Sequence, residues 1–171
     1  MSALTRRALG GFMLGCLAPF GARAARTAAP SSSKPVLTIS GHIKPPGSGD
    51  SIAFDMAALE SVGLDGFETA TPWYSGPTRF DGVRMSRLMQ LVGATGNRVT
   101  AVALNDYTTD LPFSDFEKYG VILATRRDGA YMPVRDKGPL FIVYPYDSAP
   151  ELKAQKYYSR SAWQVTQLIV A

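Results

Sequence analysis

The stretch DGAYMPVRDKGPLFIVYP, residues 128–145, decides the fold. Asp128 and Gly129 predict a tight hairpin turn, because glycine adopts positive φ without a Cβ penalty and aspartate tolerates the left-handed region. Residues 140–144 are apolar and rich in β-formers, and glycine and proline bound them, so they predict a buried central strand.

Three charged residues, Arg135, Asp136 and Lys137, stand between that turn and that strand. Proteins built on sheets commonly place ligands at strand ends, so these charges are candidates for the rim of a pocket. An ion pair in a surface loop is an equally good interpretation, because exposed salt bridges contribute little and carry no function by themselves.

An export signal is expected at residues 1–24. Arg6 and Arg7 precede an uncharged, mainly apolar run over residues 8–22, and the ARA at 22–24 has the small-x-small pattern of a cleavage site. The run is too short and glycine-rich for a membrane anchor, so we expect a soluble protein in the periplasm. The paired arginines also fit the twin-arginine route, and MLGC at 13–16 faintly resembles a lipoprotein box.

Charge and cysteine content exclude several classes of protein. The leader holds three of the 18 basic residues and none of the 14 acidic ones, so its removal lowers the formal net charge from +4 to +1. That balance does not favour a nucleic-acid partner. The single cysteine, Cys16, lies in the leader, and His42 has no second histidine or cysteine beside it, which disfavours disulfides, a thiolate nucleophile and a metal site.

The remaining chain predicts one α+β domain over residues 36–171, after a flexible lead-in at 25–35. The expected strands cover residues 36–43, 67–73, 98–104, 108–112, 121–125, 131–132, 140–144 and 163–170. A turn is expected at 74–77, and loop with some helix at 147–160. Helices are expected at 56–62 after an Asp55 cap, at the apolar stripe of Met85, Leu88, Met89 and Val92, and after a Ser114/Glu117 capping box.

Three strand ends carry uncommon clusters. Asn105-Asp106-Tyr107 follows one strand, Arg135-Asp136-Lys137 precedes the central strand, and Thr71-Pro72-Trp73-Tyr74 puts two aromatics at the end of a third. If the strands pair, these ends can converge on one mouth. Such a mouth suits a flat polar heterocycle, because aromatic faces stack a ring while carboxylates and cations bond its edges. Structural roles remain open: tryptophans in the core, Asp106 in a turn and Tyr107 in sheet packing.

The sequence lacks the motifs that the common catalytic alternatives require. The chain has no G-x-S-x-G, no phosphate-binding glycine loop and no cysteine beyond the leader. A paired-carboxylate site made by Asp106 and Asp136 stays open on their positions alone.

Several motifs in order resemble the sulfite-oxidase-type molybdopterin-binding domain. They are FDGV at 80–83 before a helix, NDYTTDLP at 105–112, LA at 123–124, DG at 128–129, KGPL at 137–140, WQ at 163–164 and IV at 169–170. The resemblance covers the chain from about Val36 and implies an α+β domain that holds a pterin in a cleft lined by loops at strand ends.

The chain departs from that family at two positions. Members that carry out molybdenum chemistry bind the metal through a cysteine near the strand aligned with residues 68–73, where this chain has none, and threonine does not replace a soft thiolate ligand. The family's lysine after the final tryptophan helps hold the cofactor's phosphate, and Gln164 stands there instead. Both departures imply a ligand without metal and without the phosphate-bearing tail.

The sequence is similar to small, exported, cysteine-free forms of this domain, which include periplasmic pterin-binding regulators of inner-membrane cyclic-di-GMP enzymes. That resemblance implies a tetrahydropterin-type ligand and a diguanylate cyclase or phosphodiesterase as partner. The expected ligand-binding residues are Trp73, Asn105, Asp106, Tyr107, Arg135, Asp136 and Lys137. The alternatives are a small oxidoreductase that binds the molybdenum cofactor without a cysteine, and an interaction module with a vestigial pocket.

Overall fold

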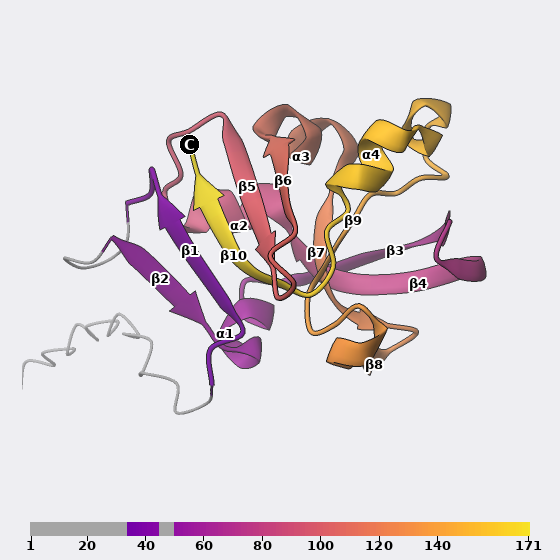
Figure 1. Ribbon diagram of the computed structural model, residues 1–171, viewed down its shortest axis with the longest axis horizontal. Helices are drawn as coiled ribbons and strands as arrows, with labels where there is room; N and C mark the ends of the chain where they lie inside the picture. The colour runs from indigo at the N-terminus through magenta and orange to yellow at the C-terminus, as the bar shows by residue number, and fades with distance from the viewer. Residues whose placement is uncertain (1–33, 45–49) are drawn as a thin grey trace, which may run out of the picture. The chain divides into compact units, whose positions relative to one another are not determined.

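The computed structural model describes residues 34–44 and 50–171 (Figure 1). The expected export signal, nearly all of the lead-in and the loop at 45–49 lie outside the described residues. In the part of the chain that is described, no helix has both the length and the apolar character needed to cross a membrane.

The first sheet is mixed and five-stranded, in the order β2-β1-β10-β5-β6. Its strands are β1 (Leu37–Gly41), β2 (Ser51–Phe54), β5 (Arg98–Ala103), β6 (Thr108–Pro112) and β10 (Val165–Val170). β1 and β10 are parallel, and the other neighbours are antiparallel. The strand that comes last in the chain is therefore the middle strand of this sheet (Figure 1).

The second sheet is antiparallel and is built around β7. Its strands are β3 (Leu64–Thr71), β4 (Tyr74–Arg84), β7 (Ile122–Arg127), β8 (Ala130–Tyr131) and β9 (Phe141–Val143). One edge of β7 pairs with β4, whereas the other edge pairs with β9 along its first half and with β8 along its second half.

Short helices connect the strands. They are α1 (Met56–Glu60), α2 (Met85–Leu91), α3 (Phe113–Tyr119) and α4 (Gln155–Arg160), with 3₁₀ turns η1 (Val134–Asp136) and η2 (Pro150–Lys153). The predicted α+β class, mostly short strands with a few short helices, is confirmed.

A single apolar cluster joins the two sheets and the helices. It includes fully buried side chains such as Ile39 and Leu168 from the first sheet, Phe80 and Ile142 from the second, and Leu88 from α2. The four stripe residues that predicted α2 are all buried, so the i, i+3, i+4, i+7 pattern located the core-facing side of this helix.

Two local signals have the expected geometry. Asp128 and Gly129 both have positive φ, at 51° and 80°, and join β7 to β8 with Arg127 opposite Ala130. Asp55 caps α1, because its Oδ1 accepts a hydrogen bond from the backbone N–H of Ala58 at 2.7 Å.

Three local predictions are wrong. The expected turn at 74–77 is the start of β4, because β3 and β4 form a long hairpin whose tip is Pro72 and Trp73. Ser114 does not cap α3, which begins after Pro112 and has no side-chain cap. The strand expected at 140–144 is buried as predicted, but its length and central position are wrong. β9 pairs with β7 on one side, and on the other it forms an isolated bridge with Trp163, where the N–H of Ile142 donates to the carbonyl of Ala162 at 2.9 Å.

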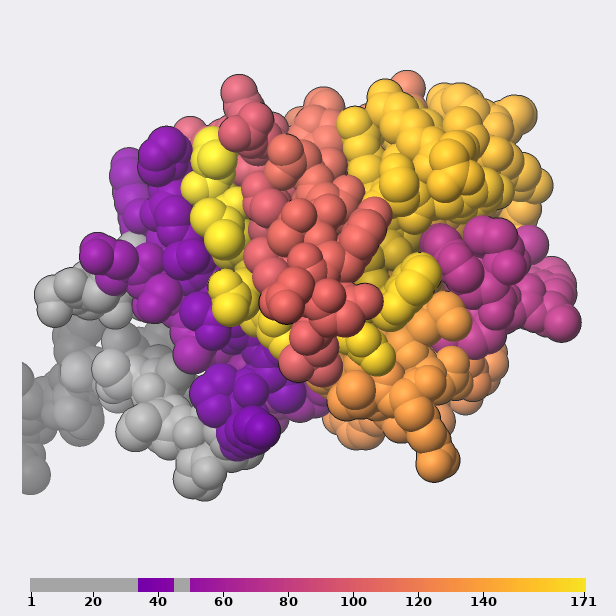
Figure 2. Space-filling view, viewed as in Figure 1, coloured from indigo at the N-terminus to yellow at the C-terminus, as the bar shows by residue number. Residues whose placement is uncertain are grey.

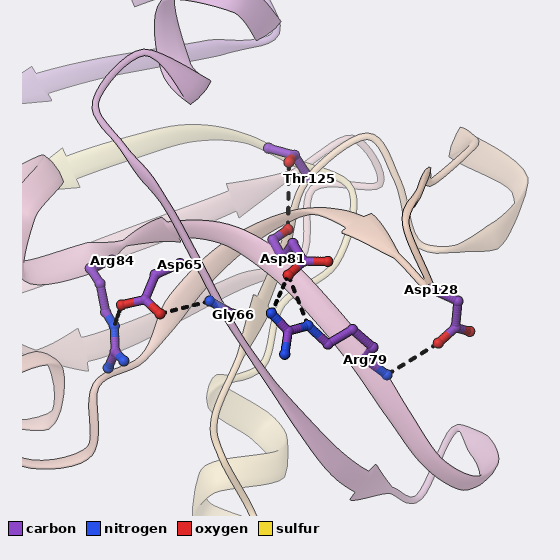
Figure 3. Close-up of polar contacts among 7 residues, drawn as sticks. All are labelled: Asp65, Gly66, Arg79, Asp81, Arg84, Thr125 and Asp128. Atoms are coloured by element: carbon purple, nitrogen blue, oxygen red, sulfur yellow. Dashed lines mark hydrogen bonds and ion pairs between the residues drawn. The ribbon is translucent and has the colours of Figure 1, made fainter.

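Charged side chains reinforce the β3–β4 hairpin and its contact with the β7–β8 turn (Figure 3). Arg84 Nε donates to Asp65 at 2.6 Å across the two strands, and Arg79 pairs with Asp81 at 2.8 Å along β4. The carboxylate of Asp128 accepts from the backbone N–H of Arg79 at 3.1 Å. These contacts fix the base and middle of the hairpin that carries Trp73 at its tip.

Candidate ligand-binding pocket

A pocket of about 500 Å³ lies where the β3–β4 tip, the β5–β6 turn and the chain around α4 meet. It is lined by Pro72, Trp73, Asn105, Tyr107, Gln155, Tyr158, Ser159, Ser161, Ala162 and Trp163. In the space-filling view the segment containing α4 lies beside the β5–β6 segment (Figure 2). The volume is within the roughly 300–1,000 Å³ typical of small-molecule sites.

Trp73 is held in place by other aromatic rings. Its ring lies edge-on to those of Phe141, Trp163, Tyr158 and Tyr146, at centroid distances of 5.4, 5.6, 6.0 and 6.2 Å. Edge-to-face pairs of this kind each add roughly 0.5–1.5 kcal/mol beyond burial. The indole is therefore part of the packing and also lines the pocket.

The β5–β6 turn supplies a second wall. Tyr107 is half-exposed, and its hydroxyl donates to the backbone carbonyl of Ser159 at 2.7 Å, which ties the turn to α4. Asn105 Oδ1 accepts from the backbone N–H of Tyr107 at 3.3 Å. Among the described residues no hydrogen bond uses the Nδ2 group of Asn105, which can therefore donate to a ligand.

Asp106 lies between those two residues but does not line the pocket. It adopts the left-handed region with φ 61°, and its N–H donates to the carbonyl of Ala103 at 3.1 Å. Its side chain is exposed. In this structure Asp106 has the turn role that was its structural alternative.

Arg135, Asp136 and Lys137 lie at η1, and none of them lines the pocket. Asp136 accepts from the hydroxyl of Tyr74 at 3.0 Å and from Arg127 at 2.7 Å. Although partial burial raises the pKa of Asp136, these two donors outweigh it and hold that pKa below its ordinary value. Arg135 is exposed.

Lys137 connects this charged cluster to the pocket. Its ammonium lies over the ring of Tyr74 at 4.7 Å and over the ring of Trp163 at 5.5 Å, and Trp163 is a lining residue. Cation–π contacts of this kind contribute roughly 0.5–2 kcal/mol. The structure thus brings Trp73, Asn105 and Tyr107 together at one pocket, with Lys137 behind its wall.

Gln164, which follows the lining residue Trp163, joins the β5–β6 turn to the chain at η1. Its backbone N–H donates to the carbonyl of Lys137 at 3.1 Å, and its carbonyl accepts from the N–H of Leu104 at 3.0 Å. Its side-chain Nε2 donates to the carbonyl of Val134 at 2.6 Å. Gln164 has φ 56°, an uncommon value for a non-glycine residue, and these bonds hold it there.

The side of α4 away from the pocket is anchored by a buried ion pair. Arg160 donates to Asp115 Oδ2 at 2.7 Å, and the hydroxyl of Tyr144 donates to the same oxygen at 2.8 Å. Burial, together with the adjacent carboxylate, raises the pKa of Tyr144 well above its ordinary value. The phenol therefore stays protonated and remains a donor.

A second anchor lies at the floor of the pocket. The hydroxyl of Tyr146 is hydrogen-bonded to Ser161 Oγ, which in turn bonds the carbonyl of Tyr157 at 3.0 Å. Burial raises the pKa of Tyr146. The lining hydroxyl of Ser161 is thus engaged within the protein.

Sequence reasoning did not include the pocket residues contributed by α4 and the chain that follows it. These are Gln155, Tyr158 and Ser159, from the stretch expected to be loop with some helix, then Ser161 and Ala162, and Trp163, which was expected to begin the closing strand. The adjacent tyrosines at 157 and 158 were the sequence signal that could have indicated this wall. In the structure Tyr157 is buried and Tyr158 lines the pocket.

No protein-family model matches the sequence, and no curated protein matches it either. Within residues 34–44 and 50–171 there is no group of three or more His, Cys, Asp or Glu side chains placed to hold a metal ion. The lining residues themselves are therefore the guide to which ligands the pocket can bind.

Proposed function

We propose that the protein is a periplasmic binding protein for a pterin, in a reduced, molybdenum-free form, and that it relays ligand status to an inner-membrane cyclic-di-GMP enzyme. The observation that carries the proposal is the pocket at the β3–β4 tip. Two indoles, two phenols and two amide side chains line one cavity.

This lining matches the chemistry of a bicyclic heterocycle. Aromatic walls such as Trp73 and Trp163 can contact the ring's faces or edges, and each base-like stack contributes roughly 1–3 kcal/mol. The Nδ2 group of Asn105 can donate to a ring carbonyl or ring nitrogen. The resemblance of the NDY and KGPL runs to molybdopterin-type domains is the second support, because Asn105 and Tyr107 line the pocket and Lys137 lies over the ring of the lining residue Trp163.

The proposed partner contact lies next to the pocket. Leu104 and Val134 are exposed apolar residues, and both are hydrogen-bonded through their backbones to Gln164. A change in the position of Tyr107 or Trp163 on ligand binding would be passed to these neighbours through the same backbone. The periplasmic domain of a diguanylate cyclase or phosphodiesterase is the partner we propose for this surface.

The first experiment exports the full chain, purifies the protein from the periplasm and measures pterin by mass spectrometry and molybdenum by elemental analysis. Pterin without molybdenum is the expected result. Stoichiometric molybdenum would instead favour the oxidoreductase alternative, and the absence of both would favour an interaction module.

A binding titration tests the site itself. The chain has two tryptophans, and both line the pocket, so quenching of their fluorescence by 6-methyltetrahydropterin under anaerobic conditions reports on this cavity. Asn105→Ala should weaken binding about tenfold, the equivalent of roughly 1.4 kcal/mol for a lost hydrogen bond. Gln167→Ala, an exposed amide on β10, is the matched control. Equal affinities for the two variants would contradict the site assignment.

A further inference from the structure

The lining of the pocket is electrically neutral. Of the ten described residues that form it, none is Asp, Glu, Lys, Arg or His. Its polar side-chain groups are two amides, two serine hydroxyls, two phenols and the N–H groups of two indoles. A ligand with a charged substituent would find no counter-ion among these groups.

Three of the charged residues nearby contact other protein groups, whereas Asp106 and Lys156, which adjoin lining residues, have exposed side chains that are not part of the lining. Lys137 lies over the rings of Tyr74 and Trp163, and Asp136 is bound to Tyr74 and Arg127. On α4, Arg160 forms the ion pair with Asp115. A ligand anion that recruited Arg160 would compete with the ion pair that anchors α4.

Aromatic walls add a penalty for anions in particular. The faces of Trp and Tyr rings carry negative electrostatic potential, so they attract cations and repel carboxylates and phosphates. Moving an unpaired charge out of water is costly in itself. The pocket therefore discriminates by charge as well as by ring shape.

We infer that the site accepts pterins whose ring substituent is uncharged and rejects those that carry a carboxylate or phosphate on it. This selectivity rests on the proposed pterin function and narrows it to one chemical class. Molybdopterin-like and folate-like ligands are excluded by it, because the first carries a phosphate and the second a glutamate.

The test compares two probes that differ in one group, 6-methyltetrahydropterin and 6-carboxytetrahydropterin, by anaerobic tryptophan quenching of the full chain at neutral pH. The methyl compound should bind at least about tenfold more tightly. Equal or tighter binding of the carboxylate would overturn the inference and leave the pterin function standing. If neither probe binds, the proposed function fails, and the inference fails with it.

Two variants of one lining residue test whether the charge of the pocket sets the selectivity. Gln155 is an exposed lining residue at the start of α4, so a charge there is compatible with folding. Gln155→Lys should shift the ratio of the two affinities about tenfold toward the carboxylate, and Gln155→Glu should shift it toward the methyl compound. If both variants kept the wild-type ratio, the charge of this pocket would not set the selectivity.

Discussion

Replacing Arg160 by methionine should destabilise the protein through a carboxylate left without its cation. Asp115 is almost entirely inaccessible, with 8% of its side chain exposed, whereas 19% of Arg160 is exposed. In Arg160→Met the Asp115 carboxylate keeps the Tyr144 hydroxyl as its only side-chain donor among the described residues. Removing one partner of a buried pair costs roughly 3–5 kcal/mol, and we take about 3 kcal/mol because Arg160 reaches solvent.

The reverse substitution should be milder. In Asp115→Asn the guanidinium of Arg160 can turn its free donors to water, and Tyr144 can still donate to the amide oxygen. We therefore expect a cost of about 1–1.5 kcal/mol, in the range of a single hydrogen bond. The double variant should cost less than the sum of the two, because neither unpaired charge remains.

Urea unfolding followed by circular dichroism, with thermal melts, measures these differences. At about 2–4 °C per kcal/mol for a chain of this size, Arg160→Met should lower Tm by roughly 10 °C. A cost below about 1 kcal/mol for Arg160→Met, or additive costs in the double variant, would refute the reasoning. Either result would mean that the pair is effectively solvated.

Two further predictions concern the second sheet. Partial burial raises the pKa of Glu60, but hydrogen bonds from Arg126, Thr125 and Tyr131 outweigh burial and lower that pKa overall. The ionised Glu60 side chain therefore stabilises the fold above about pH 4.5. This contribution disappears as pH falls through the lowered pKa. Glu60→Gln should accordingly lower the free energy of unfolding by about 1–3 kcal/mol at pH 7 and by almost nothing in strong acid. Urea unfolding at several pH values measures this difference. A loss that does not change with pH would contradict the prediction. Gly82→Ala should lower the free energy of unfolding by at least about 1–3 kcal/mol in the same assay, because a Cβ there would lie 2.2 Å from the backbone carbonyl oxygen of Leu123. An unchanged free energy would show that β4 and β7 can separate.

Much of the fold followed from local rules. The apolar stripe of α2, the Asp55 cap and the Asp128-Gly129 turn each depend on a few adjacent residues, so the sequence predicted them correctly. The alternation of apolar and small polar residues over 36–43 likewise placed β1, and the apolar residues at 102–104 placed β5. These features need no knowledge of distant partners.

The errors arose where a distant partner overrides local preference. Gly76 and Pro77 are typical of a turn, yet residues 74–77 extend β4 because cross-strand pairing with β3 continues through Ala70 opposite Pro77. The burial of Val165, Leu168 and Val170 was expected and is confirmed, but strict alternation does not describe it, because β10 changes register between Val165 and Gln167.

Only part of the candidate site was predictable from the sequence, because the rest depends on partners that local patterns do not reveal. Trp73, Asn105 and Tyr107 were expected because they follow strands, and they line one pocket. Asp136 was expected on the same ground, but Tyr74 and Arg127 bind its carboxylate, which no local pattern could indicate. The wall from α4 depends on long-range anchoring by Asp115, 45 residues earlier than Arg160.

The central place of β10 in the first sheet has a consequence for biosynthesis. β1 and β5 have no shared partner until residues 165–170 have left the ribosome, because β10 pairs with both. Before that moment the β1–β2 hairpin must keep its apolar side in solvent or on a chaperone. The nascent chain should therefore stay open and sensitive to protease until synthesis reaches β10, and a transporter that threads unfolded polypeptide would have that whole interval in which to engage it.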